Sequence, residues 1–338
     1  MNLSYRTRQT LKYVAIVSVI VILIAALVWL CWFVWLNRFV VYTRNEGAKL
    51  DFSLSGYAPG EVAVEPPEET VSIYYNEGDN AINTGRELTQ LTGYYVNREM
   101  LIGGTDQVLQ QVRGLDRETP IMIEVKSALG NFFYSSAVAE HRDSKVDPVA
   151  VDELIKELKK SGYYLIAKLP AFRDRMYGLN HVDDGVFDTR GAYLYRDDGG
   201  CYWLNPQKQG TLTYVISIVS ELKEMGFNEV VFDYFDFPET EYMRFNGDKT
   251  EALATAAKTL MTSCGTNNFT VSFVQKPGFT LPEGKTRLYI KDAVAADAQT
   301  IAQETGIADP KIGLVFLTEF HDTRFDEFSV LRPLDAAF

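Results

Sequence analysis

Residues 229–238 read EVVFDYFDFP and follow the helix-like run ELKEMGFN at residues 221–228. An apolar strand that ends in a cluster of carboxylates and aromatic residues is typical of the functional rim of a (β/α) barrel. In such a barrel the C-terminal ends of the parallel strands carry the chemistry, so Asp233 and Asp236 are the first candidate functional residues. The alternative is a buried strand whose acidic residues only cap the next element.

The chain after residue 92 alternates apolar strand-like runs with amphipathic segments, which indicates βα units and a parallel sheet. Asp147 and Pro148 suit the N-cap and first turn of one helix, and Asn205 and Pro206 suit those of the next, which should end at Gly226. The predicted strands are residues 94–97, 121–126, 164–169, 230–236, 270–274, 287–291 and 312–318, with 328–331 a weaker eighth.

A doubly wound open sheet would give a similar periodicity. However, no glycine-rich phosphate turn follows the first predicted strand, and Gly103-Gly104 alone is a weak signal. We therefore predict that residues 92–338 form an α/β domain, a TIM-like (β/α) barrel that is either complete or one strand short.

The N-terminal region contains a long apolar segment. Residues 13–36 hold no charged residue and are long enough to cross a hydrocarbon core of about 30 Å as a helix. Trp29, Trp32 and Trp35 suit an interfacial belt, and basic residues precede the segment. We expect residues 1–44 to form a cytoplasmic N-terminus and an uncleaved single-pass transmembrane anchor, with the barrel outside the cell membrane. An inverted anchor with a cytoplasmic barrel is the alternative.

The composition excludes some partners. The chain has 33 Lys and Arg against 45 Asp and Glu, and without the five basic residues up to Arg44 the counts are 28 and 45, a net charge of −17. Such a surface repels nucleic acid and anionic lipid. Residues 45–91 include the run EPPEE and predict an acidic, proline-containing stalk. Cys31 lies in the anchor, and spacing does not decide whether Cys201 and Cys264 pair.

Three motifs occur in the order found in a known family. They are Glu124-Val125-Lys126, then Ala167-Lys168 with Phe172-Arg173-Asp174, and then residues 232–238, FDYFDFP. Their combination resembles the putative glycoside hydrolase domain family of bacterial surface proteins, a TIM-barrel group, over roughly residues 93–319. The resemblance implies a barrel that cleaves glycosidic bonds in a polysaccharide or oligosaccharide, without a cofactor.

This chain departs from the family pattern at three positions. Asp236 replaces the usual arginine of the third motif, which reverses a charge near the expected sugar site, and Glu124 replaces an aspartate. Val274 stands where the family often has an acid. A chitinase-like mechanism is disfavoured because Phe235 occupies the position of its glutamate.

Glycoside hydrolysis requires two carboxyl groups on either side of the scissile bond. Asp233 is the candidate nucleophile or charge-stabilising carboxylate, since it closes a strand at the most recognisable acid of the motif. Glu124 is the first candidate general acid and Glu319 the second, because each closes a predicted strand. The structural alternatives are a salt bridge of Glu124 with Lys126 or Lys168, and a solvent-facing loop for Glu319.

The connection at residues 173–204 is long and rich in aromatic residues, which predicts a lid whose rings either stack on sugars or pack it on the barrel. The candidate substrate-binding residues are Lys126, Lys168, Arg173, Tyr202, Trp203, Tyr234 and Asp236. No metal site is predicted, although His181 with Asp183 and Asp184, or His321 with Asp322, could contribute to a hard-cation site.

Two classes of function therefore remain open. The first is a membrane-anchored glycoside hydrolase that acts on envelope or extracellular polysaccharide by carboxylate acid/base chemistry. The second is a catalytically inactive barrel that binds glycan or an envelope protein, which Val274 and the missing arginine favour.

Overall fold

The computed structural model describes residues 87–337 and, nearer the N-terminus, residues 18, 21, 23–25, 27–29, 32, 40–43 and 47–50. The chain divides into two compact units, Met1–Tyr74 and Tyr75–Phe338. In the first unit, β1 (Val40–Thr43) and β2 (Gly47–Leu50) form an antiparallel hairpin that the sequence analysis did not predict.

Most of the predicted anchor and nearly all of the predicted stalk lie outside the described residues, so the proposed domain boundaries stay a prediction. None of the helices in the described part combines the length and the apolar character that crossing a bilayer requires.

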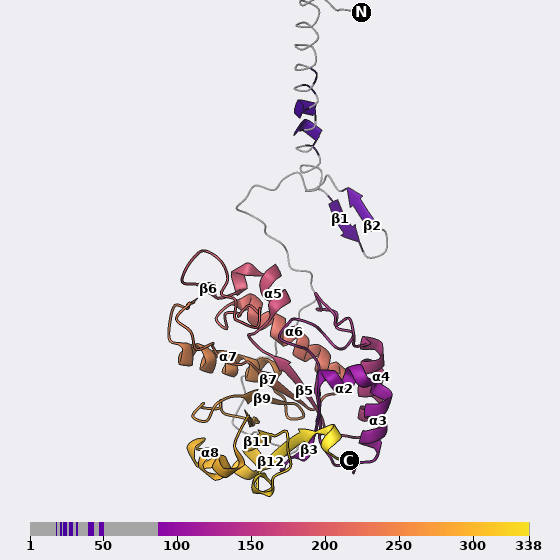
Figure 1. Ribbon diagram of the computed structural model, residues 1–338, viewed down its shortest axis with the longest axis vertical. Coiled ribbons are helices and arrows are strands. Elements are labelled where there is room, and N and C mark those ends of the chain that lie inside the picture. The colour runs from indigo at the N-terminus through magenta and orange to yellow at the C-terminus, as the bar shows by residue number, and fades with distance from the viewer. Residues whose placement is uncertain are drawn as a thin grey trace, which may run out of the picture. The chain divides into compact units, whose positions relative to one another are not determined.

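The second unit is a closed barrel of eight parallel strands (Figure 1), which confirms the predicted TIM-like fold. The barrel is complete, because β12 pairs with β3 from Val330 opposite Thr92 to Pro333 opposite Tyr95. The strands are β3 (Thr92–Val96), β4 (Ile121–Glu124), β5 (Leu165–Pro170), β7 (Glu229–Asp233), β9 (Thr270–Val274), β10 (Leu288–Lys291), β11 (Leu314–Leu317) and β12 (Ser329–Pro333).

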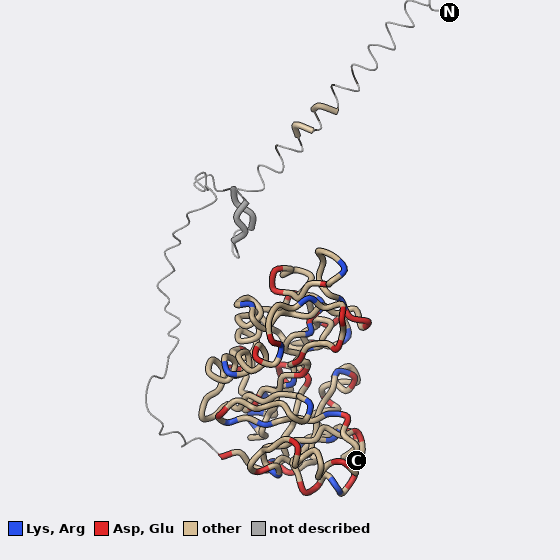
Figure 2. The backbone as a smooth tube through the Cα atoms, turned by 90° about the vertical axis from the view of Figure 1, so that its left-hand side faces the viewer, with Lys and Arg blue, Asp and Glu red and all other residues tan. Residues whose placement is uncertain are grey.

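Helices surround the strands (Figure 1). They are α2 (Arg98–Gly103), α3 (Thr105–Arg113), α4 (Pro148–Lys160), α5 (Arg175–Asn180), α6 (Gln209–Met225), α7 (Lys249–Cys264), α8 (Ala298–Glu304) and α9 (Pro310–Gly313). Short 3-10 turns add η3 (Val182–Asp184), η4 (Ala295–Asp297), η5 (Thr323–Phe325) and η6 (Leu334–Ala337). Figure 2 shows acidic and basic residues interspersed over this unit.

Strand alternation separates the apolar residues outside the barrel from those inside it. Residues such as Ile121, Leu165 and Val230 face outward and pack under the helices. Their neighbours face the barrel axis and form the inner core of Leu91, Met122, Ile166, Val231, Val274, Tyr289, Val315 and Leu331. The inward-facing positions at the C-terminal strand ends therefore point into the mouth of the barrel.

The predicted helix boundaries are confirmed in part. Asp147 caps α4 by accepting a hydrogen bond from the Val149 amide at 3.0 Å, and Gly226 ends α6 in the left-handed conformation, with φ of 98°. The predicted start of α6 at Asn205 is wrong. The Asn205 side chain instead accepts from the amide of Gln207 in a turn, and the helix begins at Gln209.

The N-terminal end of the barrel interior holds a buried ionic network. Glu229, the first residue of β7, is fully buried and pairs with the guanidinium of Arg287. Its carboxylate also accepts hydrogen bonds from the Tyr164 hydroxyl at 2.9 Å, the Ser272 hydroxyl at 2.7 Å and the Tyr289 hydroxyl at 2.9 Å. The members of this network lie in or directly before β5, β7, β9 and β10. The network therefore links four strands of the barrel.

Two cysteines of the barrel unit are resolved as free thiols. Cys201 and Cys264 are both buried and unpaired. Burial raises the pKa of Cys264 to about 12, so this thiol stays protonated at neutral pH.

Candidate active site

The mouth of the barrel collects charged side chains from four strands. Glu124 ends β4, Lys168 lies near the end of β5, Asp233 ends β7 and Lys291 ends β10. Each lies two residues after an inner-core residue of its own strand. Because side chains two residues apart on a strand point to the same side, all four face the barrel axis. Strand alternation and barrel closure thus bring together residues that lie far apart in the sequence.

Asp233 is held between two lysines. Its Oδ1 accepts a hydrogen bond from Nζ of Lys291 at 2.8 Å, and its Oδ2 lies 3.2 Å from Nζ of Lys168. The Tyr234 amide donates to Oδ1 at 2.8 Å. Burial opposes ionisation, but the attraction of both lysines outweighs it and holds the pKa of Asp233 below its ordinary value. The side chain of Asp233 is therefore ionised at neutral pH.

A cavity of about 330 Å³ opens beside Asp233. Two of its lining residues, Tyr234 (φ 49°) and Asp292 (φ 60°), are the non-glycine residues with positive φ in residues 87–337. Each directly follows a charged strand-terminal residue, Asp233 or Lys291. Such backbone strain persists only where surrounding structure enforces it and clusters at functional sites. The cavity is lined by Asp233, Tyr234, Asp236, Val274, Gln275, Lys276, Pro277, Ile290, Lys291 and Asp292.

Asp236 lies in the wall of this cavity and differs from Asp233 in its electrostatics. Its Oδ1 is buried and has no hydrogen-bond partner among the described residues. Burial raises the pKa of its carboxyl above the ordinary value, and Asp233 adds to that effect, while Lys291 opposes it. The two carboxyl groups of one cavity thus have pKa values that are shifted in opposite directions, a pattern typical of acid/base pairs.

Glu124 adjoins the same mouth from the opposite side. It is half-buried and shares a small cavity of about 20 Å³ with Lys168, Asp233 and Tyr234. Its Oε2 accepts a hydrogen bond from the Arg98 amide at 3.0 Å. The alternative of a salt bridge with Lys126 or Lys168 does not occur, because Lys126 pairs with Asp174 and Lys168 with Asp233.

Glu319 follows β11 at the same end of the barrel but is exposed and lines neither of these cavities. Its negative charge acts on Tyr95, whose pKa is raised first by burial and then by Glu319. The structure therefore places Glu319 at the rim, away from the Asp233 cavity.

Lys126 is enclosed below the lid. Its side chain is 1% exposed and pairs with Asp174, while Nζ lies 5.4 Å from the centre of the Phe132 ring. Asp174 also caps α5 through the Tyr177 amide and accepts from the Tyr214 hydroxyl at 3.0 Å. The pair fixes the start of the lid against β4, and Lys126 lines the small cavity that Glu124 and Asp233 share.

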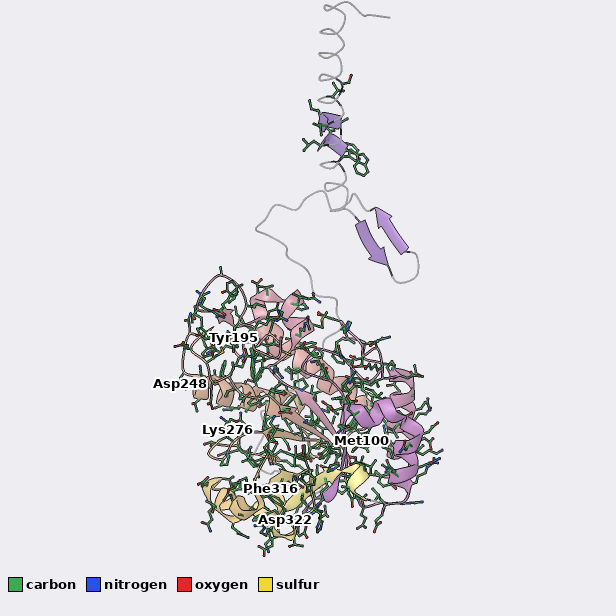
Figure 3. The ribbon with its side chains drawn as sticks, in the orientation of Figure 1. Met100, Tyr195, Asp248, Lys276, Phe316 and Asp322 are labelled. Atoms are coloured by element: carbon green, nitrogen blue, oxygen red, sulfur yellow. The ribbon has the colours of Figure 1, made fainter. Side chains whose placement is uncertain are left out.

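The lid, residues 173–204, is tied to the loop after β7. Its strand β6 (Phe187–Asp188) pairs with β8 (Met243–Arg244), and Tyr195, labelled in Figure 3, lies in its aromatic cluster with Trp203. Trp203 is 5% exposed and donates from Nε1 to Asp197 at 3.0 Å. This ring packs the lid on the barrel, whereas Tyr202 remains half-buried.

Tyr234 connects the lid to the site. The Arg173 guanidinium lies 4.8 Å from the centre of its ring, and Nζ of Lys291 lies 4.6 Å from it. Trp203 meets the same ring edge-on at 6.2 Å. Arg173 is itself fixed by a hydrogen bond from Nε to Asp197 at 2.6 Å. Arg173 and Trp203 therefore brace Tyr234 and with it the strained turn after Asp233.

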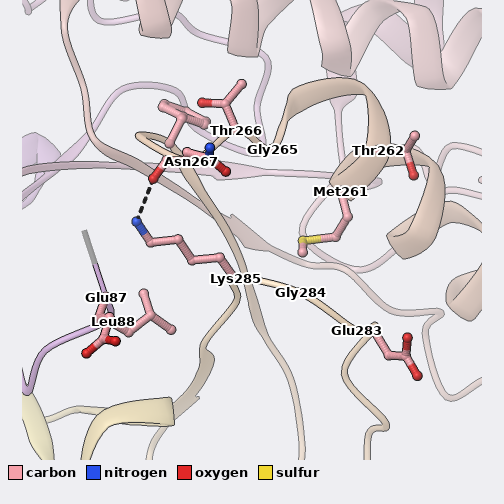
Figure 4. Close-up of a pocket in the computed structure, with 11 residues that line it drawn as sticks. Glu87, Leu88, Met261, Thr262, Gly265, Thr266, Asn267, Glu283, Gly284 and Lys285 are labelled. Carbon is pink, nitrogen blue, oxygen red and sulfur yellow. Dashed lines mark hydrogen bonds between the residues drawn. The ribbon is translucent and has the colours of Figure 1, made fainter. Parts of the chain in front are cut away.

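A larger cavity of about 690 Å³ lies at the other end of the barrel (Figure 4). Its walls come from segments that precede strands, including Glu87 before β3, Phe269 before β9 and Lys285 before β10. Nζ of Lys285 donates to the Asn267 carbonyl at 3.0 Å across it. The N-terminal end of such barrels serves stability and the C-terminal end serves chemistry, so the smaller cavity beside Asp233 is the candidate site.

Metal ligands do not gather in the described part of the chain. No group of three or more His, Cys, Asp or Glu residues there could hold a metal ion. His181 pairs with Glu140, and His321 lies 3.7 Å from Asp326.

Sequence reasoning did not single out Lys291. The signal was available, because Lys291 closes a predicted strand in the same way as Asp233 does. The sequence alone does not show where β10 lies in the closed barrel. Its position there brings Lys291 into contact with Asp233.

The fold and the carboxylate-lined mouth define a TIM-barrel protein of the glycosidase-like class. Residues 95–271, just over half of the chain, match the model of the family described as "Putative glycosyl hydrolase domain", and the chain belongs to that family. The predicted family resemblance is therefore confirmed. No curated protein matches the chain significantly.

Two solved structures share this fold. An α-galactosidase from Lactobacillus brevis is 12% identical with a TM-score of 0.50, and a GH36 α-galactosidase from Geobacillus stearothermophilus is 10% identical with a TM-score of 0.53. The matches cover 74% and 75% of this chain but only 38% and 40% of those proteins. A hypothetical protein from Ruminiclostridium thermocellum is 23% identical with a TM-score of 0.46, over 53% of this chain and 96% of that one.

Proposed function

We propose that this protein is a glycoside hydrolase that cleaves glycosidic bonds of a polysaccharide or oligosaccharide at the mouth of its barrel. The observation that carries the proposal is Asp233, an ionised carboxylate fixed at a strand end beside a cavity of about 330 Å³ and a second carboxyl group. Membership of the glycosyl hydrolase domain family supports the same reaction class.

The chemistry requires a carboxylate that either attacks the anomeric carbon or stabilises the positive charge that develops on the sugar. Lys168 and Lys291 orient Asp233 and keep it deprotonated, so it serves in this role over a wide pH range. Glu124 and Asp236 flank Asp233 on two sides, and either can supply the second carboxyl group of the reaction.

One observation favours the second candidate function, a barrel that binds glycan without cleaving it. Both oxygens of Asp233 already contact lysines, and two cations around one anion disfavour the positive charge of the transition state. Val274 forms an apolar wall of the cavity where an acid is common in the family. Under this alternative, the lysines and acids of the mouth hold sugar hydroxyls.

Reducing-end release distinguishes the two candidates. The full chain, purified in detergent, is incubated with a panel of envelope and plant polysaccharides and galactosides, and binding to the same panel is measured by co-sedimentation. A hydrolase releases reducing ends from at least one polysaccharide. Binding to a polysaccharide with no release from any member of the panel supports the non-catalytic barrel.

We also propose that residues 13–36 anchor the protein in the cell membrane, with the N-terminus in the cytoplasm and the barrel outside. The apolar length of this segment and the basic residues before it support the proposal. Intact bacterial cells that express the full chain are treated with protease. The expected result is a membrane-bound chain whose barrel is degraded from outside; a barrel that is digested only after lysis indicates the inverted orientation.

A further inference from the structure

The turn after β7 folds Asp236 back into the cavity that Asp233 occupies. Phe235 is fully buried, with its ring 4.8 Å from that of Phe172 and 4.6 Å from that of Phe273. The side chain of Gln275 donates a hydrogen bond to the Phe235 carbonyl and fixes the turn from β9. With the left-handed conformation of Tyr234, this arrangement leaves Asp233 and Asp236 lining one cavity.

The cations near Asp236 are already engaged with other acids. Lys291 pairs with Asp233, and Lys276, which Figure 3 labels on the loop after β9, pairs with Glu239. Oδ1 of Asp236 is buried without a hydrogen-bond donor among the described residues. Burial of Oδ1 without a donor disfavours the ionised carboxylate, and this effect outweighs the attraction of Lys291 and Lys276, so the pKa of Asp236 is raised.

We propose that Asp236 is the general acid of the site, and the inference rests on the proposed glycoside hydrolase function. In the reaction the bond from the anomeric carbon to the leaving oxygen breaks, its electron pair goes to that oxygen, and the Asp236 proton moves to the same oxygen. Water then supplies a hydroxyl to the anomeric carbon, and the remaining proton of that water restores the acid form of Asp236. Asp233 either bonds to the anomeric carbon, in which case the attack of water breaks that bond and releases the carboxylate, or it stays ionised and balances the positive charge of the sugar.

As a general acid, Asp236 has a role that the usual arginine of this motif could not fill. An arginine is always positive and cannot donate a proton at neutral pH, whereas a partly buried aspartic acid with a raised pKa can. The aspartate that departs from the family pattern is thus the proton donor of the site. Glu124 is less suited on geometry, because its Oε2 is already engaged by the Arg98 amide and the cavity that it lines has a volume of only about 20 Å³.

The pH dependence follows from the groups around the cavity. The charged and titratable groups that face Asp236 are Asp233, Tyr234, Glu239, Lys276, Lys291 and Asp292. The pKa of Asp236 is raised by burial, so its proton is present at low pH and lost as pH rises through that value. The pKa of Asp233 is lowered, so this carboxylate is lost only in strong acid. Activity should therefore fall on the alkaline side when Asp236 ionises.

The test compares two leaving groups on one sugar. The full chain and its Asp236→Asn and Glu124→Gln variants are assayed on 2,4-dinitrophenyl and phenyl glycosides of each sugar that the native chain accepts. Dinitrophenolate is a weak base and leaves without being protonated, whereas phenolate needs a proton from a general acid. Loss of the general acid therefore slows hydrolysis of the phenyl glycoside only. We expect Asp236→Asn to lower kcat on the phenyl glycoside by about 10²–10⁴-fold and to change kcat on the dinitrophenyl glycoside little.

Turnover of the dinitrophenyl glycoside shows that the variant is folded, and its pH profile should lose the alkaline limb. Equal losses on both glycosides, or no loss on either, overturn the role of Asp236 while the hydrolase function stands. A leaving-group-dependent loss in Glu124→Gln alone assigns the proton to Glu124 and also overturns it. A native chain that hydrolyses no glycoside or polysaccharide overturns the hydrolase function and this inference together.

Discussion

Replacement of Glu229 by alanine is expected to destabilise the barrel by about 3–5 kcal/mol, because it leaves the buried charge of Arg287 without a partner. Both side chains are almost fully inaccessible, at 0% and 1% exposure. The variant also removes the acceptor for the hydroxyls of Tyr164, Ser272 and Tyr289. Since domains of this kind have about 5–15 kcal/mol of stability in total, the variant should be marginally folded at best.

Urea unfolding of the native and variant barrels measures this effect, with Glu153→Ala as the matched control. Glu153 pairs with Lys156 on the surface of α4, where both side chains are more than half exposed. Exposed pairs of this kind contribute only about 0–1 kcal/mol. A second variant that replaces both Glu229 and Arg287 by apolar residues should lose less than the sum of the single changes. Equal losses for Glu229→Ala and Glu153→Ala would show that the network does not stabilise the barrel.

Asparagine at position 233 is expected to lower kcat by at least about 10²–10³-fold, which is the usual effect of removing one fixed electrostatic stabiliser. The amide has nearly the shape of the carboxylate, so the fold should persist, but it neither attacks an anomeric carbon nor balances a positive sugar. It also leaves Lys168 and Lys291 with no anion between them. Their uncompensated charges further oppose an oxocarbenium-like transition state.

Turnover of the most responsive substrate is measured for Asp233→Asn beside Glu304→Gln, which alters an exposed residue of α8. Glu304→Gln should match the native chain. Thermal unfolding of both variants separates loss of chemistry from loss of structure. If Asp233→Asn turns over as fast as Glu304→Gln, the chemistry does not depend on the carboxylate of β7.

The barrel fold was predictable because local patterns agree with the global architecture. The stretch at residues 270–274 was predicted as a strand and forms β9 with the same bounds, and each of the other predicted strands overlaps a strand of the barrel. The weak point was β12, which ends in Arg332 and Pro333. Its place is secured by pairing with both β11 and β3, which are distant in sequence.

The meeting of Asp233 and Glu124 at one mouth of the barrel was predictable, but the contacts that surround them were not. The sequence placed Asp233 and Glu124 at strand ends, and the closed barrel brings them to one mouth. Lys126 was predicted to bind substrate, and the sequence did not show that its side chain pairs with Asp174, 48 residues further along the chain. The separation of Glu319 from the cavity depends likewise on how the chain turns after β11.

The different environments of Asp233 and Asp236 could not be read from the motif. Both belong to the same short stretch, and only the conformation of Tyr234 and the burial of Phe235 determine their surroundings. Lys168 and Lys291 then reach Asp233 from β5 and β10. A pattern of residue types predicts which groups are near a site, whereas burial and pairing decide which of them are charged.

A crystal structure of the Asp233→Asn variant with an oligosaccharide of the responsive polysaccharide tests the central claim most directly. The account predicts that the sugar ring occupies the cavity at the mouth of the barrel, with its anomeric carbon facing Asn at position 233 and its glycosidic oxygen within hydrogen-bond distance of Asp236. An oligosaccharide bound only on the lid, or at the opposite end of the barrel beside Lys285, would contradict it.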